Sequence, residues 1–153
     1  MQKLLLECIY PIGVISLLCP TFAGVSLGMS KASIGICNSA SIKSDIILTI
    51  IPSAFIGVGV LYSVLLFFTT APQGTPTEFS IPMKWLAAYI VTGMGMFWGS
   101  ISLGDISAVA TVTAAQQKRF KPSFFLLLVF GELIGLFGLI VGFILSVSNR
   151  VWA

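Results

Sequence analysis

The sequence predicts an all-α membrane protein, built from four transmembrane helices that form two successive helical hairpins. Hydrophobic residues make up 57% of the 153 residues, and charged residues only 8%. Soluble domains usually carry about 25% charged residues, so this chain has too few charges to cover the surface of a soluble globule. The charged residues are also unevenly distributed, because four long stretches of the chain together contain only one of them. Together these properties exclude the soluble classes.

Each stretch is long enough to cross a bilayer, whose hydrocarbon core of about 30 Å needs about 20 apolar residues in a helix. The stretches are 8–30, 46–77, 85–104 and 122–149. Pro72 should end the second helix. The first and third helices should run on into water, because no helix breaker follows Lys31 or Asp105. We therefore expect helices over 9–36, 46–70, 85–113 and 123–148.

Three connections should join these helices, over 38–45, 71–83 and 115–122. The middle one carries three prolines and a glycine, which favour a loop. Four spans place both termini on one side of the membrane. Five basic residues are grouped with the first and third connections: Lys31, Lys43, Lys118, Arg119 and Lys121. Three lie on the opposite side of the membrane: Lys3, Lys84 and Arg150. Since basic loops favour the cytoplasm, both termini should be lumenal.

We expect a single domain over 1–153, and its two halves repeat each other in sequence. Hairpin one covers about 9–70 and hairpin two about 85–148. Ser26-Leu27-Gly28 recurs as Ser102-Leu103-Gly104, an offset of 76 residues. Aromatic residues of the second and fourth helices recur with an offset of 75: Phe55, Tyr62 and Phe68 against Phe130, Phe137 and Phe143. The repeat favours duplication of an ancestral hairpin.

Small residues recur at about four-residue spacing on the first and third helices. In lipid, such stripes let two helix backbones approach closely. We expect the first and third helices to form a tight inner layer, with the bulkier second and fourth helices outside; ordinary packing within one bundle is the alternative. The helix-packing residues predicted in this way are Gly24, Gly28, Gly95, Gly99, Gly104 and Gly135.

One acid lies inside the longest apolar stretch. Glu132 follows Ser123 by nine residues, about 13 Å along a helix, which is near the middle of the bilayer. An acid there costs about 2.5–3.5 kcal/mol on insertion scales, so it is a candidate functional residue. Because burial disfavours the charged form, the carboxyl should stay protonated while it faces lipid and lose its proton on meeting water or a cation. This property suits a proton carrier.

Other interpretations of the polar residues stay open. The alternative to a proton carrier is that Glu132 is a structural carboxyl, hydrogen-bonded inside the bundle. Tyr62 is either a hydrogen-bond partner of Glu132 or an aromatic packing residue. Asp105 is expected at the membrane interface, with a second functional carboxyl as the alternative. The sequence contains no metal-ligand cluster, nucleotide loop or nucleophile–base pair, so we expect no metal, no cofactor, no nucleic-acid partner and no catalysis by this chain alone.

Residues 131–141, in which the acid precedes a Gly-aromatic-Gly sequence, resemble the last helix of the c-type proteolipid subunits of vacuolar-type (V-type) proton ATPases. The resemblance extends from about Phe22 to Ser148. The other matching segments are Ala115-Gln116-Gln117 with Arg119, then Gly28, Lys31 and Gly35-Ile36, and Ile50-Ile51-Pro52 followed by Tyr62.

This resemblance implies a mechanism and a set of partners. Proteolipids of this family form a rotor ring, and each carries one acid that faces lipid. The acid, here Glu132, would take a proton from a half-channel in the a-type stator protein, cross the bilayer neutral and release it opposite a stator arginine. ATP hydrolysis in a separate sector would turn the ring. The implied partners are other proteolipids, the stator, a protein of the central stalk and membrane lipid, in a vacuolar or other acidic endomembrane.

The chain departs from the family pattern near the end of the third helix. Ala108 and Val112 stand where the family often has Asp and Arg, and Asp105 has no counterpart. Sodium-carrying relatives place Thr and Gln before the second-helix Tyr. Val58 and Gly59 stand there instead and offer no side-chain oxygen, so we expect protons rather than sodium.

Two other functions remain open. A small four-helix proton-coupled exporter also uses one intramembrane Glu, but in its first helix and as a dimer. The position of Glu132 and the hairpin duplication disfavour it. The second alternative is a structural or assembly protein of the membrane that transports nothing. In that case full activity would remain after the loss of Glu132.

Overall fold

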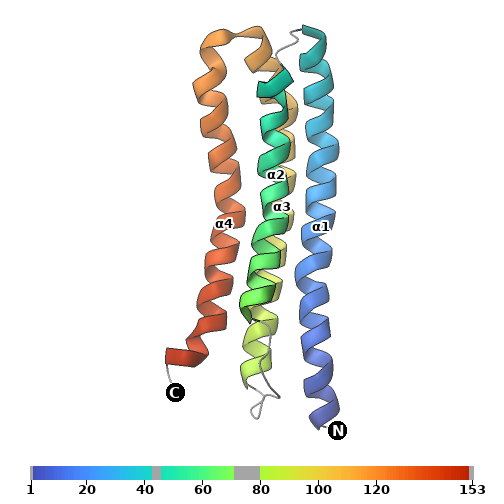
Figure 1. The fold of residues 1–153 in the computed structure, drawn as a ribbon, viewed down its shortest axis with the longest axis vertical. Coiled ribbons are helices and arrows are strands. Elements are labelled where there is room, and N and C mark those ends of the chain that lie inside the picture. Colours follow the sequence, from blue (N-terminus) through green and yellow to red (C-terminus); the bar gives the residue numbers. More distant parts are fainter. Residues whose placement is uncertain (1, 43–45, 71–79, 152–153) are drawn as a thin grey trace.

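Four long helices run alongside one another in the computed structural model (Figure 1). The structure describes residues 2–42, 46–70 and 80–151, and the side chains of 8–42, 50–70 and 81–147. The helices are α1 (Gln2–Ile42), α2 (Ile46–Thr70), α3 (Ser80–Gln116) and α4 (Lys121–Val151), with a short 3₁₀ helix, η1 (Lys118–Phe120), before α4. Apart from Gln117, every described residue is helical. The expected all-α architecture of four helices is therefore confirmed, and the expected bounds of α2 are correct at both ends.

The other helices are longer than the sequence predicted. α1 begins at Gln2 and continues to Ile42, so the start of the expected first connection is helical. α3 begins at Ser80, which places Pro82 in its first turn instead of in a loop. Hydropathy marks only the part of a helix that lies in hydrocarbon, whereas backbone hydrogen bonds continue beyond it. A proline is tolerated in a first turn because the N–H that it lacks has no partner there. The loop residues Pro72, Gly74 and Pro76 lie outside the described part.

All four helices are long and apolar enough to cross a membrane. With 41 residues, α1 is about 60 Å long, twice the hydrocarbon thickness of about 30 Å. Figure 1 shows the start of α1 and the end of α4 at the same end of the bundle, and the α3–α4 connection at the other. Lys118, Arg119 and Lys121 lie at that connection. The side chains of Lys3, Lys43 and Arg150 lie outside the described part.

Lys31 lies inside α1, eleven residues before Ile42. The expected helix over 9–36 already contained this lysine, although the count of basic residues grouped it with the first connection. Lys31 therefore adds nothing to the charge of a loop.

The contact between α1 and α3 is the most extensive in the bundle. A Cβ atom at Gly24 would lie 2.5 Å from Cα of Phe97, and one at Gly104 would lie 2.7 Å from Cα of Gly28. On its other side α3 packs against α4, where a Cβ at Gly95 would lie 3.0 Å from Cα of Gly138. The missing side chains let the three backbones approach closely, which is how helices gain packing contacts in lipid.

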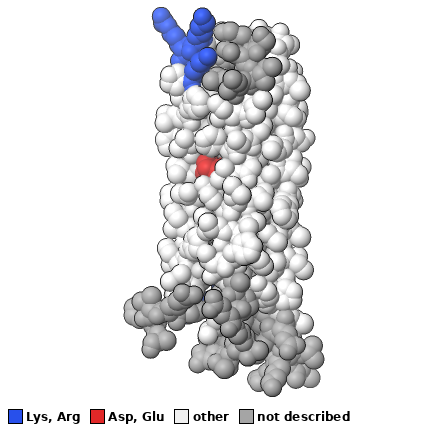
Figure 2. All heavy atoms as spheres, viewed as in Figure 1, with Lys and Arg blue, Asp and Glu red and all other residues white. Residues whose placement is uncertain are grey.

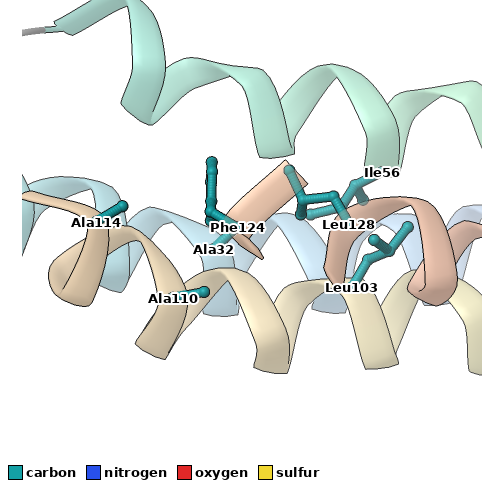
Figure 3. Packing of buried hydrophobic residues seen from close by; sticks show 7 residues of the cluster. All are labelled: Ala32, Ile56, Leu103, Ala110, Ala114, Phe124 and Leu128. Carbon is teal, nitrogen blue, oxygen red and sulfur yellow. The ribbon is translucent and has the colours of Figure 1, made fainter. Parts of the chain in front are cut away.

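Two apolar clusters fill the interior, one above the other. The cluster nearer the α3–α4 connection draws on all four helices (Figure 3): Ala32, Ile56, Leu103, Ala110, Ala114, Phe124 and Leu128. The second contains Leu17, Leu66, Tyr89, Met96 and Leu139. Among the described residues, three hydrogen bonds between neutral groups tie the helices together: Thr21 to Ser63 at 2.8 Å, Thr70 to Tyr89 at 2.7 Å, and the Thr92 hydroxyl donating to the Gly138 carbonyl at 3.1 Å.

Candidate functional site: an acid on the last helix

Glu132 is the only acid of α4 and lies well inside it. It follows the first residue of the helix, Lys121, by eleven positions, about 16 Å along the axis. The helix continues past it to Val151. The acid therefore lies near the middle of the apolar span Lys118–Val147, which is long enough to cross a membrane.

The surroundings of Glu132 on α4 divide into two faces. Gly131, Gly135 and Gly138 are buried against α3. The opposite face is exposed and apolar: Phe125, Leu126, Leu127, Val129, Phe130, Ile134, Phe137, Ile140, Val141 and Ile144. Glu132 itself is partly exposed, between the two faces. Figure 2 shows an acidic patch surrounded by uncharged side chains, with basic side chains at one end of the molecule.

The glycines beside the acid hold α4 tightly on α3. A Cβ at Gly131 would lie 2.8 Å from the Leu103 side chain, and one at Gly135 would lie 3.1 Å from the sulfur of Met96. A Cβ at Gly99 would in turn lie 3.0 Å from the backbone nitrogen of Gly135. Close backbone packing fixes the height of Glu132 along the bundle.

No cation neutralises Glu132 within the part of the chain that the structure describes, and no hydrogen bond to its carboxyl occurs there either. A carboxyl without a cation in an apolar environment favours the neutral, protonated form. The same group becomes charged when water or a positive charge reaches it. The site can therefore hold one proton reversibly.

Tyr62 comes from α2 and is half-buried beside the second apolar cluster. The described residues contain no hydrogen bond between its hydroxyl and the Glu132 carboxyl. A bond between Tyr62 and Glu132 remains a prediction.

The structure contains an ion pair that the sequence analysis missed. Nζ of Lys31 in α1 lies 2.8 Å from the carboxylate of Asp105 in α3. Asp105 lies eleven residues before the end of α3, which extends to Gln116; its expected place at the membrane interface stays a prediction. The repeat was the available signal: Gly28 and Gly104 are matched residues of the two halves and touch in the structure, which brings Lys31 near Asp105.

The described residues contain no group of three His, Cys, Asp or Glu side chains that could hold a metal ion. Cys8, Cys19 and Cys37 are all free and exposed. The fold and the site together define a four-helix membrane protein with one partly exposed, unpaired acid in the middle of its last helix.

Comparison with known proteins places this arrangement in a family. Residues 86–145 match the family model for the C subunits of ATP synthases. The chain is 30% identical over 138 residues to the V-type proton ATPase proteolipid subunit of Dictyostelium discoideum, covering 88% of this chain and 70% of the relative. It is 26% identical over 133 residues to a 16 kDa proteolipid of the V-type proton ATPase of Caenorhabditis elegans, covering 84% and 83%. It is 28% identical over 131 residues to the V-type proton ATPase 16 kDa proteolipid of Chrysotila carterae, covering 80% of each chain.

This chain belongs to the family of V-type proton ATPase proteolipids. It is an integral membrane protein by its four apolar helices and by its relatives. The resemblance on which the sequence analysis relied is confirmed.

Proposed function

We propose that this chain is a proton-carrying, c-type proteolipid of the rotor ring of a V-type ATPase, and that Glu132 binds and releases the transported proton. The observation that carries the proposal is the position of Glu132. It is the one acid of α4, it lies near the middle of the apolar span Lys118–Val147, and it is partly exposed between apolar side chains. A rotor proteolipid needs an acid of this kind, because the group must cross lipid neutral and ionise only where the stator meets it.

The exposed apolar face of α4 supports the same function. A ring of these proteolipids would present α4 to lipid and to the stator, with α1 and α3 in the inner layer. The a-type stator protein would supply the arginine that displaces the proton, and a protein of the central stalk would transmit rotation. The chain would act in a vacuolar or other acidic endomembrane, with both termini lumenal. ATP hydrolysis would take place elsewhere in the complex.

Protons fit the site better than sodium. A sodium ion needs several oxygen ligands, whereas the positions before Tyr62 are Val58 and Gly59, which offer none from their side chains. A single carboxyl is sufficient for a proton.

The test is Glu132→Gln in the assembled complex, with ATP-driven acidification of membrane vesicles as the measurement. The amide keeps the size and the hydrogen-bonding capacity of the acid but cannot exchange a proton, so acidification should be abolished while ring assembly is normal. Glu132→Asp should give an intermediate rate, because the carboxyl remains but its reach is shorter by one methylene.

A hydrophobic carbodiimide reacts with protonated carboxyls that are accessible from lipid, so it should label Glu132 at neutral pH in the same membranes. Acidification retained by Glu132→Gln would refute the assignment. Labelling that maps to Asp105 instead of Glu132 would also contradict it.

A further inference from the structure

The ion pair between Lys31 and Asp105 lies on the surface of the single chain. The side chain of Lys31 is 43% exposed and that of Asp105 is 59% exposed, although the two groups are 2.8 Å apart. In the described part of the chain neither has a second charged partner. The proposed proton transfer at Glu132 does not use this pair.

The contacts of α3 with α4 fix the depth of the pair. The two helices run in opposite directions (Figure 1), and Gly131 packs on Leu103 while Gly135 packs on Gly99. Glu132 is therefore level with residue 102, and Asp105 lies three residues, or about 4.5 Å, nearer the α3–α4 connection. With Glu132 at the middle of the bilayer, as the proposed function requires, the pair lies at the depth of hydrocarbon, because the hydrocarbon half-thickness is about 15 Å.

A half-exposed ion pair at this depth cannot face acyl chains without a large penalty, because hydrocarbon solvates neither charge. Charged residues in membrane spans face other protein or a water-filled space. The surface that carries Lys31 and Asp105 should therefore face either another protein surface or water in the assembled protein.

A second copy of this chain meets that requirement. An ammonium has three donors and a carboxylate about four acceptor sites, so the contact within one chain leaves both groups able to bind again. A neighbouring copy presents the opposite charges at the same depth.

We infer that Lys31 and Asp105 form a belt of alternating charges around the ring, in which each lysine contacts the aspartate of its own chain and that of a neighbour. This inference rests on the ring proposed above. It identifies the partner of the pair as a second copy of the same chain and gives the two residues a role in holding copies together. Asp105 is a departure from the family pattern, so the belt would be a property of this chain.

Co-expression separates contacts between chains from contacts within one. Lys31→Gln leaves the aspartate without its lysine, and Asp105→Asn leaves the lysine without its aspartate. Either variant alone should lower the yield of rings about tenfold, because an uncompensated charge is left in a low-dielectric site. Differently tagged copies of the two variants, expressed together, should recover rings that contain both tags to within about twofold of the unmodified chain, since each lone lysine would meet a neighbour's aspartate.

Two controls accompany the mixture on native gels of solubilised membranes, with total protein level measured in parallel. Two differently tagged copies that both carry Lys31→Gln should show no recovery. The double variant Lys31→Gln/Asp105→Asn carries neither charge and shows that the chain folds without the pair.

The belt is overturned if the mixture recovers no rings although the double variant assembles, since the pair is then closed within one chain or covered by lipid headgroups or water. Absence of rings from the unmodified chain would overturn both the belt and the proposed function. Rings that pump normally but show no recovery in the mixture would overturn the belt alone.

Discussion

Along the contact of α1 with α3, glycines bring two backbones together, whereas the exposed face of α4 carries a row of bulky apolar side chains. Hydrophobicity does not separate the two regions, because both are apolar and lipid solvates apolar groups as well as a protein interior does. Side-chain size separates them. Gly24, Gly28 and Gly104 lie where backbones meet, while Phe130 and Phe137 lie where nothing in the described chain covers them.

The two regions also differ in how their charged side chains are paired. Lys31 and Asp105 form an ion pair on the α1–α3 side. No cation pairs with Glu132 in the described part of the chain, as the proposed role in carrying a proton requires. The two regions therefore differ in whether their acid has a cation beside it.

The largest effect on this comparison should come from Gly28→Leu. A Cβ at this position already meets the carbonyl group of Ser100, with the carbonyl carbon at 2.9 Å. A leucine would force α1 and α3 apart, and lipid offers no hydrophobic gain in return. We expect complete loss of assembled complexes on native gels of solubilised membranes, at unchanged total protein.

Phe130→Leu is the matched control for that variant. Phe130 is 58% exposed on α4, and lipid accepts either side chain, so assembly should be normal. Normal complexes with Gly28→Leu and none with Phe130→Leu would show that side-chain size is not what distinguishes the two regions.

A smaller effect should separate two glycine-to-alanine changes. A Cβ at Gly104 would lie 2.5 Å from the Gly28 carbonyl oxygen, whereas a Cβ at Gly57 meets nothing within 4 Å. Alanine favours a helix over glycine by about 1 kcal/mol, but overpacking costs about 1–3 kcal/mol. Gly104→Ala should therefore lower the free energy of unfolding in detergent, and Gly57→Ala should leave it unchanged or raise it. An equal gain in both variants would mean that the close approach at Gly104 is not needed.

The smallest effect concerns a hydrogen bond between α3 and α4. Thr92 donates to the Gly138 carbonyl at 3.1 Å, and interhelical bonds in membranes contribute about 0.6 kcal/mol on average. Thr92→Val should lower the free energy of unfolding by about that amount. Thr113→Val is the control, because that hydroxyl bonds only to Val109 of its own helix. Equal losses in the two variants would show that the bond between helices contributes nothing of its own.

The number of spans, the bounds of α2 and the position of Glu132 inside its helix could all be predicted from the order of residues. Each of these depends on a local property: the length of an apolar stretch, a proline after it, and the number of residues between an acid and the end of its helix. Such properties are independent of what the helix packs against, so a single chain read in order is sufficient to obtain them. The small residues of α1 and α3 likewise marked helices able to approach closely.

Only the folded structure shows which side chains of different helices contact each other. Lys31 and Asp105 are 74 residues apart, and their contact requires a particular register of α1 on α3, which depends on how the two glycine-containing faces fit together. The hydropathy pattern also could not predict the full lengths of α1 and α3, because a helix does not end where hydrocarbon ends. Pairing and register arise from the mutual fit of surfaces that are distant in the chain, and composition and spacing along one helix carry no measure of that fit.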